Sequence, residues 1–318
     1  MTTLFLGSYG FGNLGDELCL IEAAQRYVSQ EPWAFSADAD FTSRATGVRQ
    51  FISTRQGIAD LNPTRVVLGG GGVGFWPSFR DSLHWLHDAI ELGAEVHIHN
   101  IGVSNITEKE WFDDVVVRDV LQRVATFSVR DHISQWMVER WGFGRRPDLT
   151  FYPEAHLPAE PFAFDLPDGK LVGFSITSQR GMLRAIDDNR DRLRRYIDGL
   201  GEFTAVPVVS TVHRLSDEED DIAGFNYFAE RILDGRPVAL KESLDPAWWR
   251  ATVTPLRLKY LISRLDLLVS QRKHNVIHAI GAKTPFVGVF PAIYDSIARI
   301  VYSLRRQLPD GSSLLALD

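Results

Sequence analysis

Residues 4–17, LFLGSYGFGNLGDE, decide the fold of this chain. The stretch begins with an apolar strand pattern and continues into a loop that carries four glycines, Gly7, Gly10, Gly12 and Gly15. The helical pattern LCLIEAAQRYV follows directly. This strand–loop–helix order is typical of the start of an open α/β sheet, and its glycines let backbone N–H groups approach a ligand beside a helix N-terminus.

The same loop does not match a known phosphate cradle. Its spacing is not G-x-G-x-x-G followed by an acid about twenty residues later, so the dinucleotide fingerprint is absent. Asp16 and Glu17 would also repel a phosphate group. Two interpretations stay open: a ligand loop with Asn13 and the two acids in it, or a tight turn that only caps the helix.

The overall composition excludes several classes of protein. A chain of 318 residues can hold two domains or one large one, and its net charge of −7 argues against nucleic acid as the main partner. The single cysteine, Cys19, excludes intramolecular disulfides and cysteine zinc fingers. Neither a signal-peptide pattern nor an apolar run of membrane-spanning length is visible, which predicts a cytoplasmic protein.

Strand and helix patterns alternate in both halves of the sequence, which predicts parallel βαβ units. Residues 144–170 are rich in proline and poor in periodicity, so they read as a linker. We therefore expect an α/β fold with two Rossmann-like domains, at 1–150 and 151–318, that face each other across a ligand cleft. The tail at 308–318 is expected to pack loosely.

Further candidate site residues follow predicted strands in the first half. A run of four glycines at 69–72, including Gly71 and Gly72, indicates either close approach to a ligand or tight packing. Trp76 follows this run. Arg130 ends another strand, where a guanidinium suits a carboxylate or phosphate and Asp131 would cap the next helix. A structural ion pair is the alternative for Arg130.

The segment Ser270-Gln271-Arg272-Lys273-His274-Asn275 is the strongest candidate for an anion site. Arg272, Lys273 and His274 would stand at a helix N-terminus, where positive charge is unfavourable unless an anion binds. His274 could also exchange a proton near neutral pH. Other candidates are weaker: His213 could face the cleft, His278 is expected to be structural, and the acidic run at 217–221 is expected to be an exposed helix start.

Four motifs in order, YGFGNLGDE, the GGGG run after RVVL, SVRD and SQRKHNVIHAIGAKTPFVGV, resemble the polysaccharide pyruvyl transferases. That family passes the enolpyruvyl carbons of phosphoenolpyruvate to a sugar as a ketal. The resemblance implies a glycosyltransferase-B-like fold, phosphoenolpyruvate as donor substrate, no cofactor and no metal. It also implies a saccharide acceptor, which we expect to be lipid-linked, with contact at the inner membrane surface left open.

The resemblance assigns roles to residues of this chain. It places donor binding on Arg130, Arg272, Ser270 and Lys273, and acid or phosphate contact on His274. It places the base or acceptor contact on Asp16. The acceptor side would include Gly12, Asn13, Gly15, Glu17, Gly71, Gly72, Trp76 and His213. Trp76, Trp248 and Trp249 could stack on a sugar face.

One position departs from the pattern. Many relatives carry a lysine of the donor site where this chain has Ile297. Either Arg299 or Lys273 substitutes for it, or donor binding differs, or this chain is not an ordinary pyruvyl transferase. Two rival functions remain: a nucleotide-sugar glycosyltransferase of the same architecture, and a sugar- or anion-binding protein without catalysis.

Overall fold

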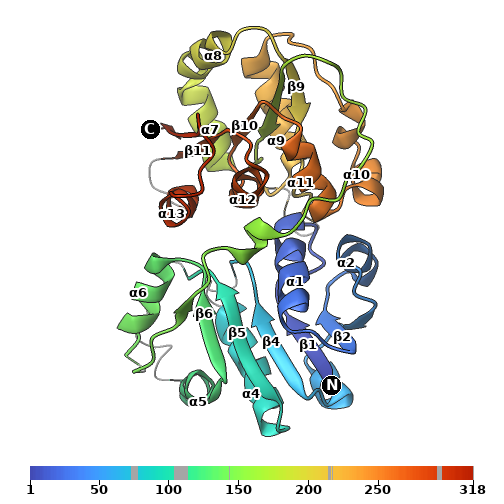
Figure 1. Cartoon of the computed structure of the whole chain (residues 1–318), viewed down its shortest axis with the longest axis vertical. Coiled ribbons are helices and arrows are strands. Elements are labelled where there is room, and N and C mark those ends of the chain that lie inside the picture. The colour runs from blue at the N-terminus through green and yellow to red at the C-terminus, as the bar shows by residue number, and fades with distance from the viewer. Residues whose placement is uncertain are drawn as a thin grey trace. The chain divides into compact units, whose positions relative to one another are not determined.

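The chain forms two compact units in the computed structural model, which describes residues 1–72, 78–103, 114–142, 144–213, 216, 218–291 and 296–317. The first unit consists of Met1–Phe11 and Asp16–Glu154, and the second of Gly12–Gly15 and Ala155–Asp318. Each is an α/β unit with its own parallel sheet (Figure 1). Four residues of the opening loop thus belong with the second unit.

The sheet of the first unit has the strand order β3-β2-β1-β4-β5-β6-β7. Its strands are β1 (Thr2–Leu6), β2 (Glu31–Phe35), β3 (Gln50–Ile52), β4 (Arg65–Gly69), β5 (Glu95–Ile101), β6 (Thr126–Val129) and β7 (Asp148–Leu149). Its helices are α1 (Leu14–Arg26), α2 (Ala39–Thr46), α3 (Gln56–Leu61), α4 (Ser78–Glu91), α5 (Val115–Arg123) and α6 (His132–Arg140). Because the order reverses beside β1, the loops after β1 and β4 lie at the point where such sheets bind ligands.

The helices of this unit cover both faces of the sheet. Leu4 and Leu6 of β1 pack in a core with α4 and α5, whereas Phe5 between them packs with Leu20 and Ala23 of α1. Successive side chains of a strand point to opposite faces, so burial of all three requires a helical layer on each side. This is the reason why the opening stretch reads as a continuous apolar run.

The sheet of the second unit has the strand order β12-β11-β10-β8-β9. Its strands are β8 (Leu171–Ser175), β9 (Thr204–Pro207), β10 (Leu267–Ser270), β11 (Phe286–Pro291) and β12 (Ser313–Leu317). Its α-helices are α7 (Arg180–Asp188), α8 (Arg190–Gly199), α9 (Asp221–Phe228), α10 (Pro246–Thr252), α11 (Pro255–Ser263), α12 (Lys273–Ala282) and α13 (Ser296–Ser303). Short turns of other helix types are η2 (Pro153–His156), η3 (Ala229–Leu233) and η4 (Lys241–Leu244). The order reverses between β8 and β10, so the loop after β10 also lies at a ligand-binding switch point.

One prediction about local structure is wrong. The tail expected to pack loosely contains β12, which pairs in parallel with β11 along five residues, from Ser313 to Leu317. Its short apolar run shows no alternation of apolar and polar residues, so the sequence did not indicate a strand. The segment becomes an edge strand only by pairing with β11. Residues 50–52 form β3, which pairs with β2 at the edge of the first sheet. In the described part of the chain, no helix is both long and apolar enough to cross a membrane.

Candidate active site

The segment after β10 forms a tight turn that begins α12. The Ser270 hydroxyl accepts a hydrogen bond from the Arg272 N–H and donates one to the Arg272 carbonyl, both at 3.0 Å. Arg272 is the N-cap residue of α12, and its side chain makes no capping hydrogen bond. Ser270 therefore fixes the backbone that carries Arg272. Lys273 and His274 are the first two residues of the helix, as the charge pattern predicted.

Arg272 is already paired with two carboxylates. Its Nε donates to Asp221 Oδ1 at 2.6 Å and its Nη1 to Glu219 Oε2 at 3.2 Å. Its Nη2 is buried and has no hydrogen-bond partner among the described residues. One edge of the guanidinium is thus held by the protein, while the donor capacity of Nη2 is unused.

The prediction that residues 217–221 form an exposed acidic helix start is wrong for Asp221, which is buried. Asp220 is the N-cap of α9, and Asp221, the next residue, points inward. Its Oδ2 accepts hydrogen bonds from Ser210 N, Ser210 Oγ and Thr211 N. Burial raises the pKa of the Asp221 carboxyl, and the charge of Arg272 opposes that shift.

The loop Gly12–Gly15 packs against this same edge of the second unit. Leu14 N donates to Ser210 O and Val212 N donates to Gly12 O, each at 2.9 Å. Asn13 Oδ1 accepts from Gly15 N at 3.0 Å, which caps the start of α1. A Cβ added to Gly15 would lie 1.8 Å from His274 Nδ1, so only glycine admits the buried imidazole at this distance. The structure thus brings Gly15 and His274 together, although the sequence had placed them on opposite sides of the site.

Glu17 is buried beneath the glycine loop of the first unit and accepts a hydrogen bond from it. Its carboxylate is fully buried, and Oε1 accepts from Gly10 N at 2.7 Å and from Thr42 Oγ1 at 3.2 Å. Gly10 has φ of +83°, a conformation that glycine adopts without strain. Burial raises the pKa of Glu17 to about 8, and the neighbouring charge of Asp16 adds to the shift. Glu17 shapes this loop and has no exposed surface for an acceptor.

Because its pKa is raised on folding, Glu17 makes stability depend on pH. Its contribution is complete below pH 4.5, where it is protonated in both states, and is lost as the pH rises towards about 8. We expect the free energy of unfolding of the wild type to lose roughly 3 kcal/mol from this group between pH 5 and pH 8. Glu17→Gln, which keeps the acceptor oxygen, should lack that loss.

Chemical denaturation at pH 5 and pH 8 measures this difference. Glu31→Gln, at an exposed glutamate of the same unit, is the control and should retain the wild-type pH dependence. An equal pH dependence in Glu17→Gln and wild type would show that Glu17 is ionised in the folded protein.

Arg130 directly follows β6 in the first unit and is buried. Its guanidinium carbon lies 5.4 Å from the ring centroid of Tyr152, and a Cβ on Gly102 would come within 2.3 Å of the guanidinium. Its Nε and Nη1 have no hydrogen-bond partner among the described residues, and its Nε lies 3.9 Å from the Asp131 carboxylate. Asp131 caps α6 by accepting from Ser134 N at 2.7 Å, as predicted. Arg130 thus keeps donor capacity for an anion.

The other residues predicted to line the site differ in their exposure and contacts. A Cβ on Gly71 would lie 2.7 Å from Asp16 Oδ1, so the loops after β1 and β4 approach closely within the first unit. Gly72 and His213 are half-buried, and Trp76 lies outside the described residues. Trp249 is fully buried and donates to Val209 O at 2.9 Å, so the prediction that it stacks on a sugar is wrong.

A sequence model of the family described as polysaccharide pyruvyl transferase matches residues 13–289. The chain belongs to this family. No curated protein sequence matches the chain. The matched range includes the turn after β10 and the segment with Arg130.

Solved structures show the same fold at low sequence identity. MnaA of S. aureus, in a structure with UDP, is 10% identical with a TM-score of 0.60, and the match covers 98% of this chain and 91% of that one. The UDP-GlcNAc 2-epimerase of Methanocaldococcus jannaschii is 10% identical with a TM-score of 0.54, with 100% and 89% covered. The expected class, two Rossmann-like α/β domains of glycosyltransferase-B type, is confirmed.

Ile297, the position where the motif resemblance leads us to expect a donor-site lysine, is buried. Arg299, two residues later in α13, is buried as well, and Lys273 is half-buried at the start of α12. Residues 292–295, which include the tyrosine and aspartate of that motif, lie outside the described residues.

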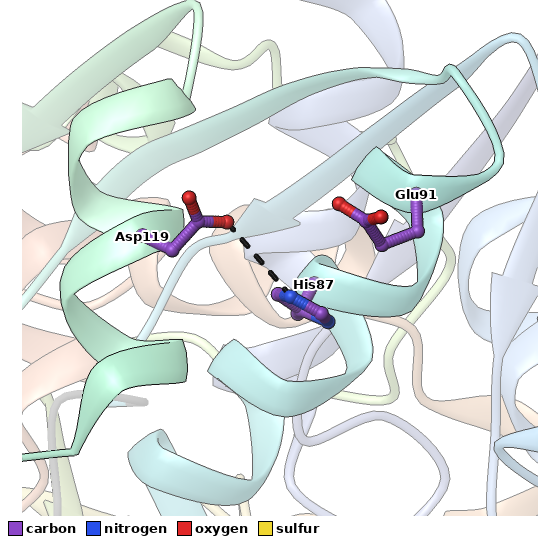
Figure 2. Close-up of side chains that lie close together, drawn as sticks. All are labelled: His87, Glu91 and Asp119. Carbon is purple, nitrogen blue, oxygen red and sulfur yellow. Dashed lines mark ion pairs between the residues drawn. The ribbon is translucent and has the colours of Figure 1, made fainter.

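One group of possible metal ligands, not predicted from the sequence, lies on α4 and α5. His87, Glu91 and Asp119 place one ligand atom each within 4.8 Å of one another, and Figure 2 shows the ion pair between His87 and Asp119. Arg123 Nη1, however, lies 2.6 Å from Glu91 Oε1 and 2.8 Å from Asp119 Oδ2. A cation already neutralises both carboxylates, so this group reads as a surface ion-pair network.

Proposed function

We propose that this chain transfers the pyruvate moiety of phosphoenolpyruvate onto two hydroxyl groups of a saccharide, forming a ketal and releasing phosphate. The observation that supports this most is the turn after β10. There a half-buried arginine whose buried Nη2 has no partner among the described residues and a buried histidine stand at the N-terminus of α12, in a chain of the pyruvyl transferase family. Such a turn suits a small dianion that must also receive a proton.

The chemistry assigns a task to each group. Arg272, with Lys273 and the α12 N-terminus, would bind the phosphate or carboxylate of the donor, and Arg130 is proposed as a further donor ligand. Protonation of the methylene carbon, which we assign to His274, makes C2 an oxocarbenium-like centre. One hydroxyl adds to C2, phosphate leaves, and the second hydroxyl closes the ketal. Each hydroxyl loses its proton, and Asp16 is the proposed base for one of them.

Membership of the family indicates only the chemical class of the acceptor. We propose a saccharide, lipid-linked, as used in exopolysaccharide or cell-surface glycan synthesis, with the protein in the cytoplasm at the membrane surface. Gly15 approaches His274, Asn13 accepts a hydrogen bond from Gly15 N, and Gly12 O accepts one from Val212 N. We therefore propose that this part of the loop shapes the donor end of the site.

Calorimetry separates the proposed function from its rivals. We expect phosphoenolpyruvate to bind and UDP and UDP-N-acetylglucosamine not to bind. Binding of a uridine nucleotide alone would support a nucleotide-sugar glycosyltransferase, a possibility that the UDP-bound MnaA structure makes worth testing. Binding of phosphoenolpyruvate without phosphate release in a panel of saccharides would support a protein that binds and does not catalyse.

A further inference from the structure

The two carboxylates on Arg272 differ in how the protein holds them. Asp221 is 1% exposed, and its Oδ2 is fixed by three hydrogen bonds from Ser210 and Thr211 while its Oδ1 holds Arg272 Nε. The Glu219 side chain is 37% exposed and contacts Arg272 Nη1 at 3.2 Å. Asp221 is therefore a rigid support for Arg272. The Glu219 side chain is partly exposed and can turn away from Arg272 into solvent.

The position of Glu219 is one that an anionic ligand would use. A guanidinium binds a carboxylate or phosphate best through two parallel N–H groups, and the Nη1–Nη2 edge is the pair that Asp221 leaves open. Glu219 takes Nη1, and Nη2 has no partner among the described residues. A dianion that contacts both nitrogens competes with the Glu219 carboxylate for the positive charge at Nη1.

We propose that Asp221 is the positioning residue of Arg272 and that Glu219 is an internal competitor of the donor, an anion held on the arginine until phosphoenolpyruvate replaces it. This inference rests on the proposed function for the identity of the donor. It assigns opposite effects to two acids that lie two residues apart. Removing the charge of Glu219 strengthens donor binding, and removing the charge of Asp221 weakens it.

The test compares Glu219→Gln and Asp221→Asn with the wild type by calorimetry, using phosphoenolpyruvate and, separately, inorganic phosphate. Glu218→Gln is the matched control, because it removes one negative charge from the same loop at a residue that pairs with Arg180. We expect Glu219→Gln to lower Kd about 3- to 10-fold relative to both wild type and Glu218→Gln, since an exposed ion pair is weak. Asp221→Asn should raise Kd at least about tenfold, which corresponds to the loss of one charged hydrogen bond.

A double variant shows whether the effect passes through Arg272. In an Arg272→Gln background, Glu219→Gln should no longer change Kd for phosphate, whereas a general electrostatic effect would persist. If Asp221→Asn does not fold, the Glu219→Gln result alone decides the competitor role. Equal affinities of Glu219→Gln and Glu218→Gln would overturn the inference.

The experiment distinguishes a wrong donor from a wrong role for Glu219. If phosphoenolpyruvate does not bind the wild type but phosphate does, and Glu219→Gln tightens phosphate, then the proposed donor is wrong and the competitor role stands. If phosphoenolpyruvate binds and Glu219→Gln leaves its Kd unchanged, then the competitor role is wrong and the donor stands.

Discussion

Arg272→Ala should lower kcat/KM for phosphoenolpyruvate by at least about 10²–10³-fold while the protein remains folded. The variant removes the guanidinium whose Nη2 has no partner among the described residues, and it takes the ion-pair partner away from Asp221. The Asp221 carboxylate would then repel a phosphate group at the same place. The loss of activity thus has two causes that act in the same direction.

Steady-state kinetics with phosphate-release detection measure this effect, and circular dichroism checks the fold. Arg264→Ala is the control, because Arg264 follows α11 in the same unit and is exposed. Double substitution, Arg272→Ala with Asp221→Asn, should recover part of the stability but not the activity, since the support for the donor is still missing. Near-normal turnover of Arg272→Ala would remove Arg272 from the donor site.

Gly15→Ala should lower kcat about 10²-fold. The substitution should not weaken helix α1. The added Cβ would lie 1.8 Å from Nδ1 and 2.2 Å from Cγ of His274, so the imidazole must move. Alanine is otherwise favoured over glycine within a helix by about 1 kcal/mol, and Gly15 lies in α1. A drop in activity in a well-folded variant would therefore report the displaced ring.

Gly199→Ala is the matched control for this prediction. Gly199 is also a helical residue, at the end of α8, and a Cβ there meets no atom within 4 Å. It should leave kcat unchanged. If Gly15→Ala is as active as Gly199→Ala, the position of His274 does not matter for the reaction and its role as the acid is wrong.

Much of the fold was predictable because the decisive signals are local. The run Leu4, Phe5, Leu6 and the glycine loop after it identify a strand buried on both faces and a switch point. The position of His274 was predictable for the same reason, since a strand, a cationic turn and a helix follow one another in the sequence. β12 was not, because a short apolar tail becomes a strand only by pairing with β11.

The partner of Arg272 was not predictable from the sequence. Asp221 lies 51 residues earlier, in a run of acids whose charge pattern alone suggests a solvated helix start. One signal was present: when two acids begin a helix, only one caps it, and the other is free to point inward. Likewise, the contact of Gly15 with His274 joins residues from opposite ends of the chain, and no local pattern reports it.

Transfer of labelled pyruvyl carbon tests the central claim most directly. Phosphoenolpyruvate labelled with carbon-13 at C2 is incubated with the enzyme and a panel of free and lipid-linked oligosaccharides, and products are analysed by mass spectrometry and phosphate release. We expect the label to enter one saccharide as a ketal, with one phosphate released per label transferred. Glycosylation of the same panel from a UDP-sugar, with no label in any saccharide, would contradict the proposed function.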